Sequence, residues 1–198
     1  MLTSDEGKKP VGPDIIENYR DFEPPSEVRK LVEELVESVP GNYLKGLKTI
    51  VLCNRAALTR DQRRQKVWGR GRKYRLVEAR GAYYRATNSR PVTVWLYVDN
   101  ILKASPAWML RIPIACYAEF GEVLFHEIGH HIHTVHVPIY DGKENVAEDW
   151  SRKLGQQFFR KHYWYLVPFR YLLLAVVKMT LRVTTRFAAT RTGQKNQT

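Results

Sequence analysis

Residues 123–131 read VLFHEIGHH, in which three bulky apolar residues precede a cluster of histidine and glutamate. On a helix, His126 and His130 lie one turn apart on the same face, so both imidazoles can reach one metal ion. Zinc accepts such nitrogens at about 2.0–2.1 Å. Glu127 is rotated by about 100° around the helix, which makes it a candidate general base rather than a ligand. The segment therefore predicts a buried helix with a zinc site and a catalytic carboxylate.

A catalytic zinc site normally has three protein ligands, so a further donor is needed. Glu144 and Glu148 are one helical turn apart in the next predicted helix, and we expect Glu144 to bind the metal and Glu148 to hold a ligand imidazole. His136 is an alternative, because H-E-x-x-H-x-x-G-x-x-H sites place their third ligand at this spacing. That pattern needs a helix-breaking glycine, and His133 stands in its place. The sequence favours Glu144 but leaves Glu148 and His136 open.

The flanking sequence predicts the elements around this helix. A helix begins near Ser26, a plausible N-cap, because apolar residues recur at helical spacing after it. Short apolar runs predict strands at 47–53, 81–87 and 92–98, the last two paired as an antiparallel hairpin. Further helices are predicted over 115–135, 144–163 and 169–187. Together these elements indicate an α+β fold, in which a small, twisted, mostly antiparallel sheet packs on the H-E-x-x-H helix and the glutamate helix.

Composition and charge divide the chain into three parts. Residues 1–25 are polar and contain four prolines, so we expect a flexible arm before a folded domain at 26–163. Residues 164–198 are expected to form a basic amphipathic helix and tail. The net charge is +12, and residues 51–90 carry twelve Lys and Arg against two Asp and Glu. Within this block, we expect residues 55–73 to form an exposed excursion or turn. Basic blocks of this kind attract polyanions and anionic membrane surfaces.

The H-E-x-x-H helix followed by a helix with E-x-x-A-E resembles the gluzincin clan of zinc metallopeptidases, the thermolysin-like architecture, and in particular its compact members, the minigluzincins. The resemblance covers about residues 47–160 and would make 26–163 a metallopeptidase-like domain that hydrolyses a protein or peptide. It implies that Glu127 is the general base and that the strand at 92–98 is the edge strand along which an extended substrate lies. The zinc ligands that it implies are His126, His130 and Glu144.

Two other classes of function stay open. The domain could be a non-catalytic binding or regulatory module with a metallopeptidase-like fold, although a glutamate beside the metal position argues for catalysis. Alternatively, the basic segments at 55–90 and 170–186 would make this a nucleic-acid-associated or membrane-associated protein. With only Cys53 and Cys116 and a polar N-terminus, we expect a cytoplasmic protein, peripheral to a membrane if the basic helix binds one. The oligomeric state is not indicated.

Overall fold

The computed structural model describes residues 12–69, 72–88, 90–106, 108–136 and 144–166. The strands are β1 (Asp14–Asn18), β2 (Thr49–Cys53), β3 (Lys66–Gly69), β4 (Arg72–Arg75), β5 (Gly81–Tyr84) and β6 (Thr93–Tyr97). The α-helices are α1 (Val28–Glu37), α2 (Gly41–Leu44), α3 (Arg60–Arg64), α4 (Val98–Ala104), α5 (Pro113–His136) and α6 (Glu144–His162). The chain divides into two compact units, Met1–Phe158 and Phe159–Thr198, and the candidate site residues belong to the first.

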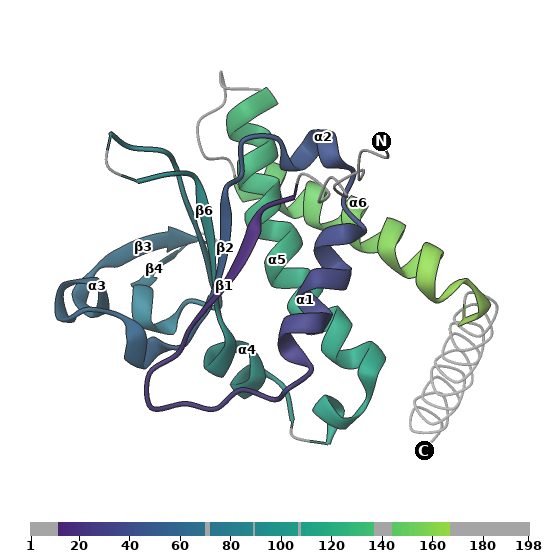
Figure 1. The fold of residues 1–198 in the computed structure, drawn as a ribbon, viewed down its shortest axis with the longest axis horizontal. Coiled ribbons are helices and arrows are strands. Elements are labelled where there is room, and N and C mark those ends of the chain that lie inside the picture. Colours follow the sequence, from purple (N-terminus) through teal and green to yellow (C-terminus); the bar gives the residue numbers. More distant parts are fainter. Residues whose placement is uncertain (1–11, 70–71, 89, 107, 137–143, 167–198) are drawn as a thin grey trace, which may run out of the picture. The chain divides into compact units, whose positions relative to one another are not determined.

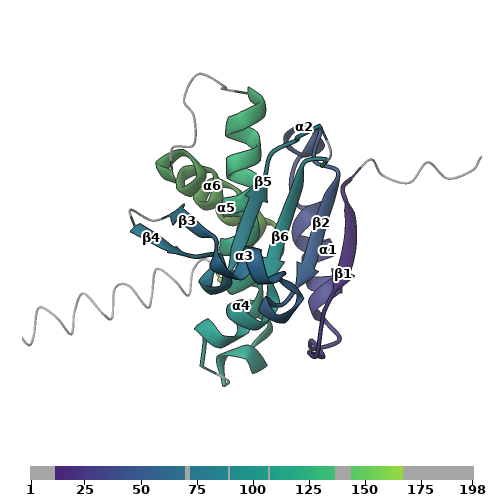
Figure 2. The same ribbon diagram turned by 90° about the vertical axis from the view of Figure 1, so that its left-hand side faces the viewer.

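The central sheet has the strand order β1-β2-β6-β5 (Figures 1 and 2). β1 pairs with β2 and β2 with β6 in parallel, whereas β5 and β6 form the predicted antiparallel hairpin. The fold is mixed α and β as expected, but the prediction of a mostly antiparallel sheet is wrong. The physical reason is the length of the connections, because a chain that crosses over through a helix or a long excursion re-enters the sheet in the same direction.

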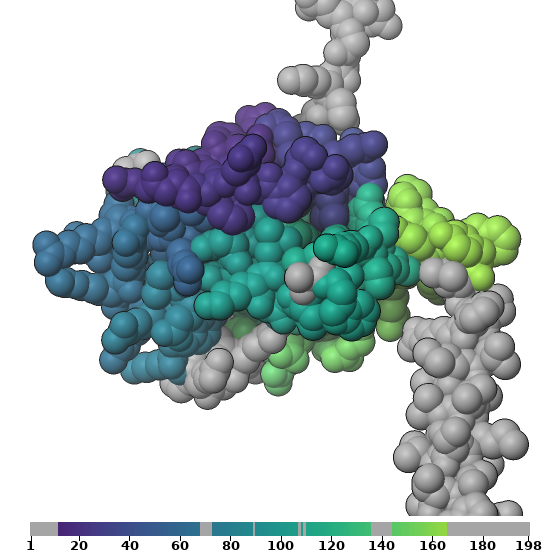
Figure 3. All heavy atoms as spheres, turned by 90° about the horizontal axis from the view of Figure 1, so that it is seen from below, coloured from purple at the N-terminus to yellow at the C-terminus, as the bar shows by residue number. Residues whose placement is uncertain are grey.

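Residues 14–18 form β1, so this part of the expected flexible arm is an ordered strand. The buried side chain of Asn54 accepts a hydrogen bond from the Arg20 N–H at 2.9 Å and donates one to the Arg20 carbonyl at 2.8 Å. These bonds hold the chain that leaves β1 against the end of β2. Figure 3 shows the purple N-terminal residues lying along the blue residues of the middle of the chain.

Alternate side chains of the sheet enter two different cores. One face is covered by α5 together with α1, whose apolar stripe is buried as the sequence predicted (Figures 1 and 2). The fully buried strand residues on this face are Ile50, Leu52, Val94 and Leu96. The opposite face carries Val51, Cys53 and Tyr97, which form a second cluster with Leu58 and Leu76.

The basic segment after β2 is folded rather than an exposed excursion. It contains helix α3 and the two-stranded sheet of β3 and β4. Helix α3 begins with a capping box, in which the side chains of Thr59 and Gln62 each accept a hydrogen bond from the other residue's backbone N–H. Val67 and Tyr74 are paired across this hairpin and pack against the second cluster. The many charges conceal this alternation, because only every second residue of a hairpin faces the core.

The remaining predicted helices have mixed outcomes. Helices α5 and α6 confirm the predictions for 115–135 and 144–163, while α1 begins after Glu27 with no side-chain cap from Ser26. The helix predicted at 169–187 lies outside the described residues. Among the residues that the structure describes, no helix combines the length and apolar character that a membrane span needs.

Candidate metal centre

Helix α5 is fixed against the sheet by its apolar residues and by a glycine of β5. Phe120, Leu124 and Ile128 recur every four residues and are fully buried. At Gly81, a Cβ atom would lie 2.8 Å from Glu127 Oε1 and 2.7 Å from Val123 Cγ1. Because such distances are shorter than van der Waals contact, only glycine lets β5 approach α5 so closely. Glu127 is consequently buried directly beside β5, with 8% of its surface exposed.

Helix α6 is brought to the histidines by a second close approach, at Gly129. A Cβ atom at this position would lie 2.8 Å from the Ala147 carbonyl oxygen and 3.1 Å from Trp150 Cβ. The glycine within H-E-x-G-H therefore has a packing role, since it allows the first turns of α6 to lie against α5. This contact places Glu144, the first residue of α6, opposite the two imidazoles.

We expect Gly129→Ala to destabilise the protein by about 1–3 kcal/mol, the usual cost of overpacking a close contact. In a helix without such a contact, the same substitution is favourable by up to about 1 kcal/mol. Gly155→Ala in α6 is the matched control, because its Cβ would meet Phe125 Cδ2 at an ordinary 3.9 Å. Urea unfolding of both variants measures the difference. Equal stability changes would contradict the role assigned to Gly129.

The three predicted ligand residues lie together. His126 Nε2 is 3.2 Å from Glu144 Oε1, and His130 Nε2 is 3.7 Å from Glu144 Oε2. One donor atom from each of the three residues lies within 4.8 Å of the other two. Ligand atoms of a tetrahedral zinc ion are separated by roughly 3.4 Å. The donor set and its spacing therefore fit a zinc ion, whereas binding of the metal itself stays a prediction.

The environment keeps His130 in the protonation state that a metal requires. Burial of the ring, and then the nearby His126, lower the pKa of His130 to about 4. The two rings are perpendicular, with their centroids 4.8 Å apart. The His130 imidazole is therefore neutral at pH 7, with a nitrogen lone pair available for a metal ion.

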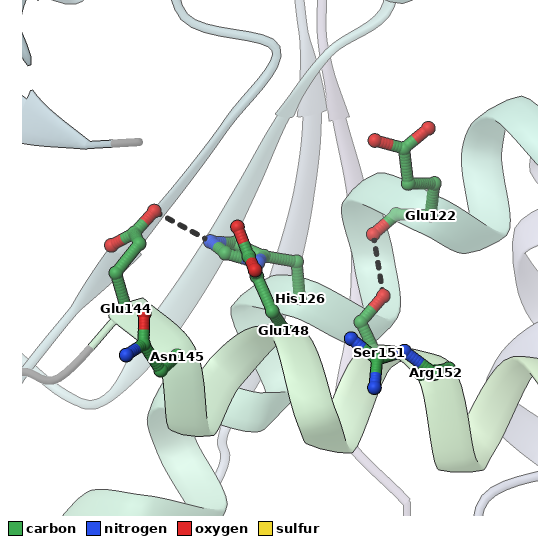
Figure 4. A pocket seen from close by; sticks show the side chains of 7 residues that line it. All are labelled: Glu122, His126, Glu144, Asn145, Glu148, Ser151 and Arg152. Carbon is green, nitrogen blue, oxygen red and sulfur yellow. Dashed lines mark hydrogen bonds and ion pairs between the residues drawn. The ribbon is translucent and has the colours of Figure 1, made fainter. Parts of the chain in front are cut away.

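The alternative third ligands are less well placed than Glu144. Glu148 is exposed and lines a pocket of about 580 Å³ together with His126. In Figure 4 the Glu144 carboxylate reaches a nitrogen of the His126 ring, and Glu148 lies one helical turn further along α6. Helix α5 continues without interruption through His136, so the backbone break that the alternative motif requires is absent from α5. The geometry thus favours Glu144 as the ligand and Glu148 as an outer residue.

Two further histidines of α5, His131 and His133, are buried. His131 is fully buried, with its Nε2 3.1 Å from the Lys45 carbonyl oxygen and its Nδ1 3.3 Å from the Tyr83 hydroxyl. His133 is 3% exposed, and its Nε2 has no hydrogen-bond partner among the described residues. His131 thereby connects α5 to β5 and to the loop before β2.

A cleft of about 400 Å³ opens over the candidate metal ligands. One wall is β5 together with Arg85, the residue that follows it. Another wall is formed by Gln65, Val67, Tyr74 and Leu76, and Glu127 also lines the cleft. The predicted edge strand, 92–98, is β6, which lies between β2 and β5 (Figure 2). That prediction is therefore wrong: β5 is the edge strand next to the candidate site.

Sequence reasoning did not identify Tyr83, Tyr84 and Arg85 as residues of the cleft. Burial raises the pKa of Tyr83, whose hydroxyl contacts His131, so this side chain is neutral at pH 7. The signal available in the sequence was the alternation of GAYYR after the basic segment. It could indicate a strand, but not that this strand lies beside the histidine helix.

No family model, no curated protein and no solved structure matches this chain.

Proposed function

We propose that this protein is a zinc-dependent metallopeptidase of the gluzincin type, which hydrolyses peptide bonds of a protein or peptide substrate. The observation that carries the proposal is the position of Glu127. This buried carboxylate adjoins a cluster of two imidazoles and a carboxylate, at an open cleft. A purely structural zinc site needs neither a base nor a cleft, which is why catalysis is favoured over a non-catalytic binding module.

The substrate would lie along β5. This strand pairs with β6 on one side, and in the described part of the chain no strand pairs with its other edge. Its backbone N–H and C=O groups can therefore hold an extended peptide by main-chain hydrogen bonds. Because Gly81 places β5 against Glu127, the peptide bond would be held close to the general base.

The chain's own residues divide the chemistry between them. His126, His130 and Glu144 would hold a zinc ion, which when bound polarises a carbonyl group and makes water more acidic. Glu127 would accept the proton of the attacking water and transfer it to the leaving amine. Its burial beside β5 restricts its rotamers, so that the carboxylate is positioned before the substrate binds.

Metal analysis and a hydrolysis assay test this proposal. We expect purified protein to contain about one zinc per chain and to cleave peptides from a degenerate library. A chelator should abolish cleavage, and added zinc should restore it. Folded protein that binds no zinc, or zinc-loaded protein that cleaves no peptide, would contradict the proposal.

A second function, binding of a polyanion, is favoured by the hairpin of β3 and β4. Lys66 and Arg75 lie directly opposite each other and are exposed, as are Arg60 and Arg64 on α3. Like charges in opposite positions of a hairpin destabilise it, and phosphate groups between them would relieve the repulsion. We infer that this basic surface, defined by these four residues, binds nucleic acid.

For this surface we expect Lys66→Gln combined with Arg75→Gln to weaken binding of a single-stranded oligonucleotide. The slope of log K against log salt should become shallower by about 1–2, because up to two phosphate contacts are lost. Lys103→Gln combined with Arg111→Gln removes the same charge from exposed positions elsewhere and is the control. Equal effects of both pairs, or binding to anionic vesicles but not to oligonucleotides, would argue against a nucleic-acid surface.

A further inference from the structure

The cleft contains a cation at the end of its edge strand. Arg85 directly follows β5, and strand alternation places it on the same face as Gly81 and Tyr83. The Gly81 position contacts Glu127, and the Tyr83 hydroxyl lies 3.3 Å from His131 on α5. The Arg85 side chain is exposed, and it lines the cleft together with His126 and His130 of α5.

The charges around the cleft do not cancel once a metal is bound. Glu127 and Glu144 are the acidic residues among its described lining, and a divalent ion offsets both. Arg85 is the only Lys or Arg among the described lining residues, so it leaves the cleft with a net positive charge. A guanidinium is always protonated and presents several donors in one plane, which suits paired hydrogen bonds to a carboxylate. The cleft is thus complementary to a peptide with a negative group beside the bond that is cleaved.

We propose that Arg85 binds a carboxylate of the substrate, so that this site selects peptides with an acidic group near the scissile bond. The inference deepens the proposed function and rests on it. Arg85 comes directly after β5. A peptide paired with the edge of β5 would therefore meet Arg85 only a few peptide residues away from the bond held at Glu127. The carboxylate can come from an Asp or Glu side chain or from the C-terminus of the peptide.

The test uses zinc-loaded full-length protein and a set of decapeptides that differ in one residue, which is Glu, Gln or Lys at successive positions. One half of the set has an amidated C-terminus and the other a free C-terminal carboxylate. Charge-assisted hydrogen bonds have moderate energies, so we expect kcat/KM to be about tenfold higher for Glu than for Gln at the preferred position, and lowest for Lys. A preference that appears only with the free C-terminus would identify the terminal carboxylate as the group bound.

Variants of Arg85 connect the preference to this residue. Arg85→Gln should abolish the preference for Glu, so that kcat/KM becomes equal for the Glu and Gln peptides, and Arg85→Glu should reverse the preference in favour of Lys. Arg20→Gln is the matched control, because its exposed side chain follows β1 at the opposite edge of the sheet. A preference for Glu that survives in Arg85→Gln would overturn the inference. So would an equal loss on all peptides, which would place Arg85 at the reacting carbonyl instead.

A binding measurement separates this inference from the proposed function. Fluorescence anisotropy of labelled peptides with zinc-loaded Glu127→Gln protein reports affinity without turnover. If the wild type cleaves no peptide, the proposed function fails, but tighter binding of Glu than of Gln peptides that depends on Arg85 still supports carboxylate recognition. Equal binding of the Glu, Gln and Lys peptides would overturn it.

Discussion

Glu127→Gln is expected to abolish peptide hydrolysis while zinc remains bound. The amide has nearly the same size as the carboxylate, so β5 can keep its close approach at Gly81. It cannot accept the proton of the attacking water, and loss of a general base typically lowers kcat by about 10²–10⁴. The two histidines and Glu144 are unchanged, and therefore the metal content should stay at one zinc per chain.

The measurement is kcat on a cleaved peptide together with zinc determined by atomic absorption. Glu119→Gln is the control on the same helix, because Glu119 is ion-paired with Arg80 and is not part of the metal cluster. We expect this control to keep almost full activity. Undiminished hydrolysis by Glu127→Gln would remove Glu127 as the base, and loss of zinc would show that the residue has a different role.

Glu144→Ala should have the second large effect, on the metal itself. Removal of the carboxylate leaves two imidazoles, which are too few donors for a tightly bound catalytic zinc. Loss of an outer partner of a ligand typically costs about 10–100-fold in metal affinity, and loss of a ligand should exceed that range. We therefore expect the zinc dissociation constant to rise by more than about 100-fold.

Glu148→Ala is the control variant for this experiment. Glu148 lines the pocket beside His126 but is exposed, and Glu144 is the carboxylate near both ring nitrogens. We expect Glu148→Ala to weaken zinc binding by no more than about 10–100-fold. Competition with a chromophoric chelator measures both variants. A larger effect at Glu148 than at Glu144 would transfer the third-ligand role to Glu148.

The parts of the fold that depend on local periodicity could be predicted. The apolar spacing of α1 and the four-residue spacing of His126 and His130 are properties of a helix alone, and α5 and α6 were predicted nearly to their ends. Glu144 could be named as a candidate ligand for the same reason, since it begins the helix that follows the histidine helix. In each case neighbouring residues in the sequence determine which side chains share a face.

The pairing of strands that are distant in the sequence could not be predicted from local sequence patterns. Five residues of β1, DIIEN, carry little pattern by themselves, and their order comes from parallel pairing with β2. The same holds for the edge of the sheet: the resemblance to gluzincins implied that the strand at 92–98 is the edge strand, yet β6 is central and β5 adjoins the candidate site. A strand's neighbours are chosen by the whole sheet, and turn residues reveal only the adjacent hairpin partner.

The sequence by itself determined two donors of the candidate centre, because helical spacing alone sets the imidazoles of His126 and His130 on one face with Glu127 beside them. Only the tertiary structure decided which strand meets these residues, since the approach of β5 to Glu127 and of α6 to α5 depends on missing Cβ atoms at Gly81 and Gly129. Arg85 entered the cleft through the same packing. Contacts of this kind join separate segments, Gly81 with Glu127 and Gly129 with Ala147, and no periodicity within either segment encodes them.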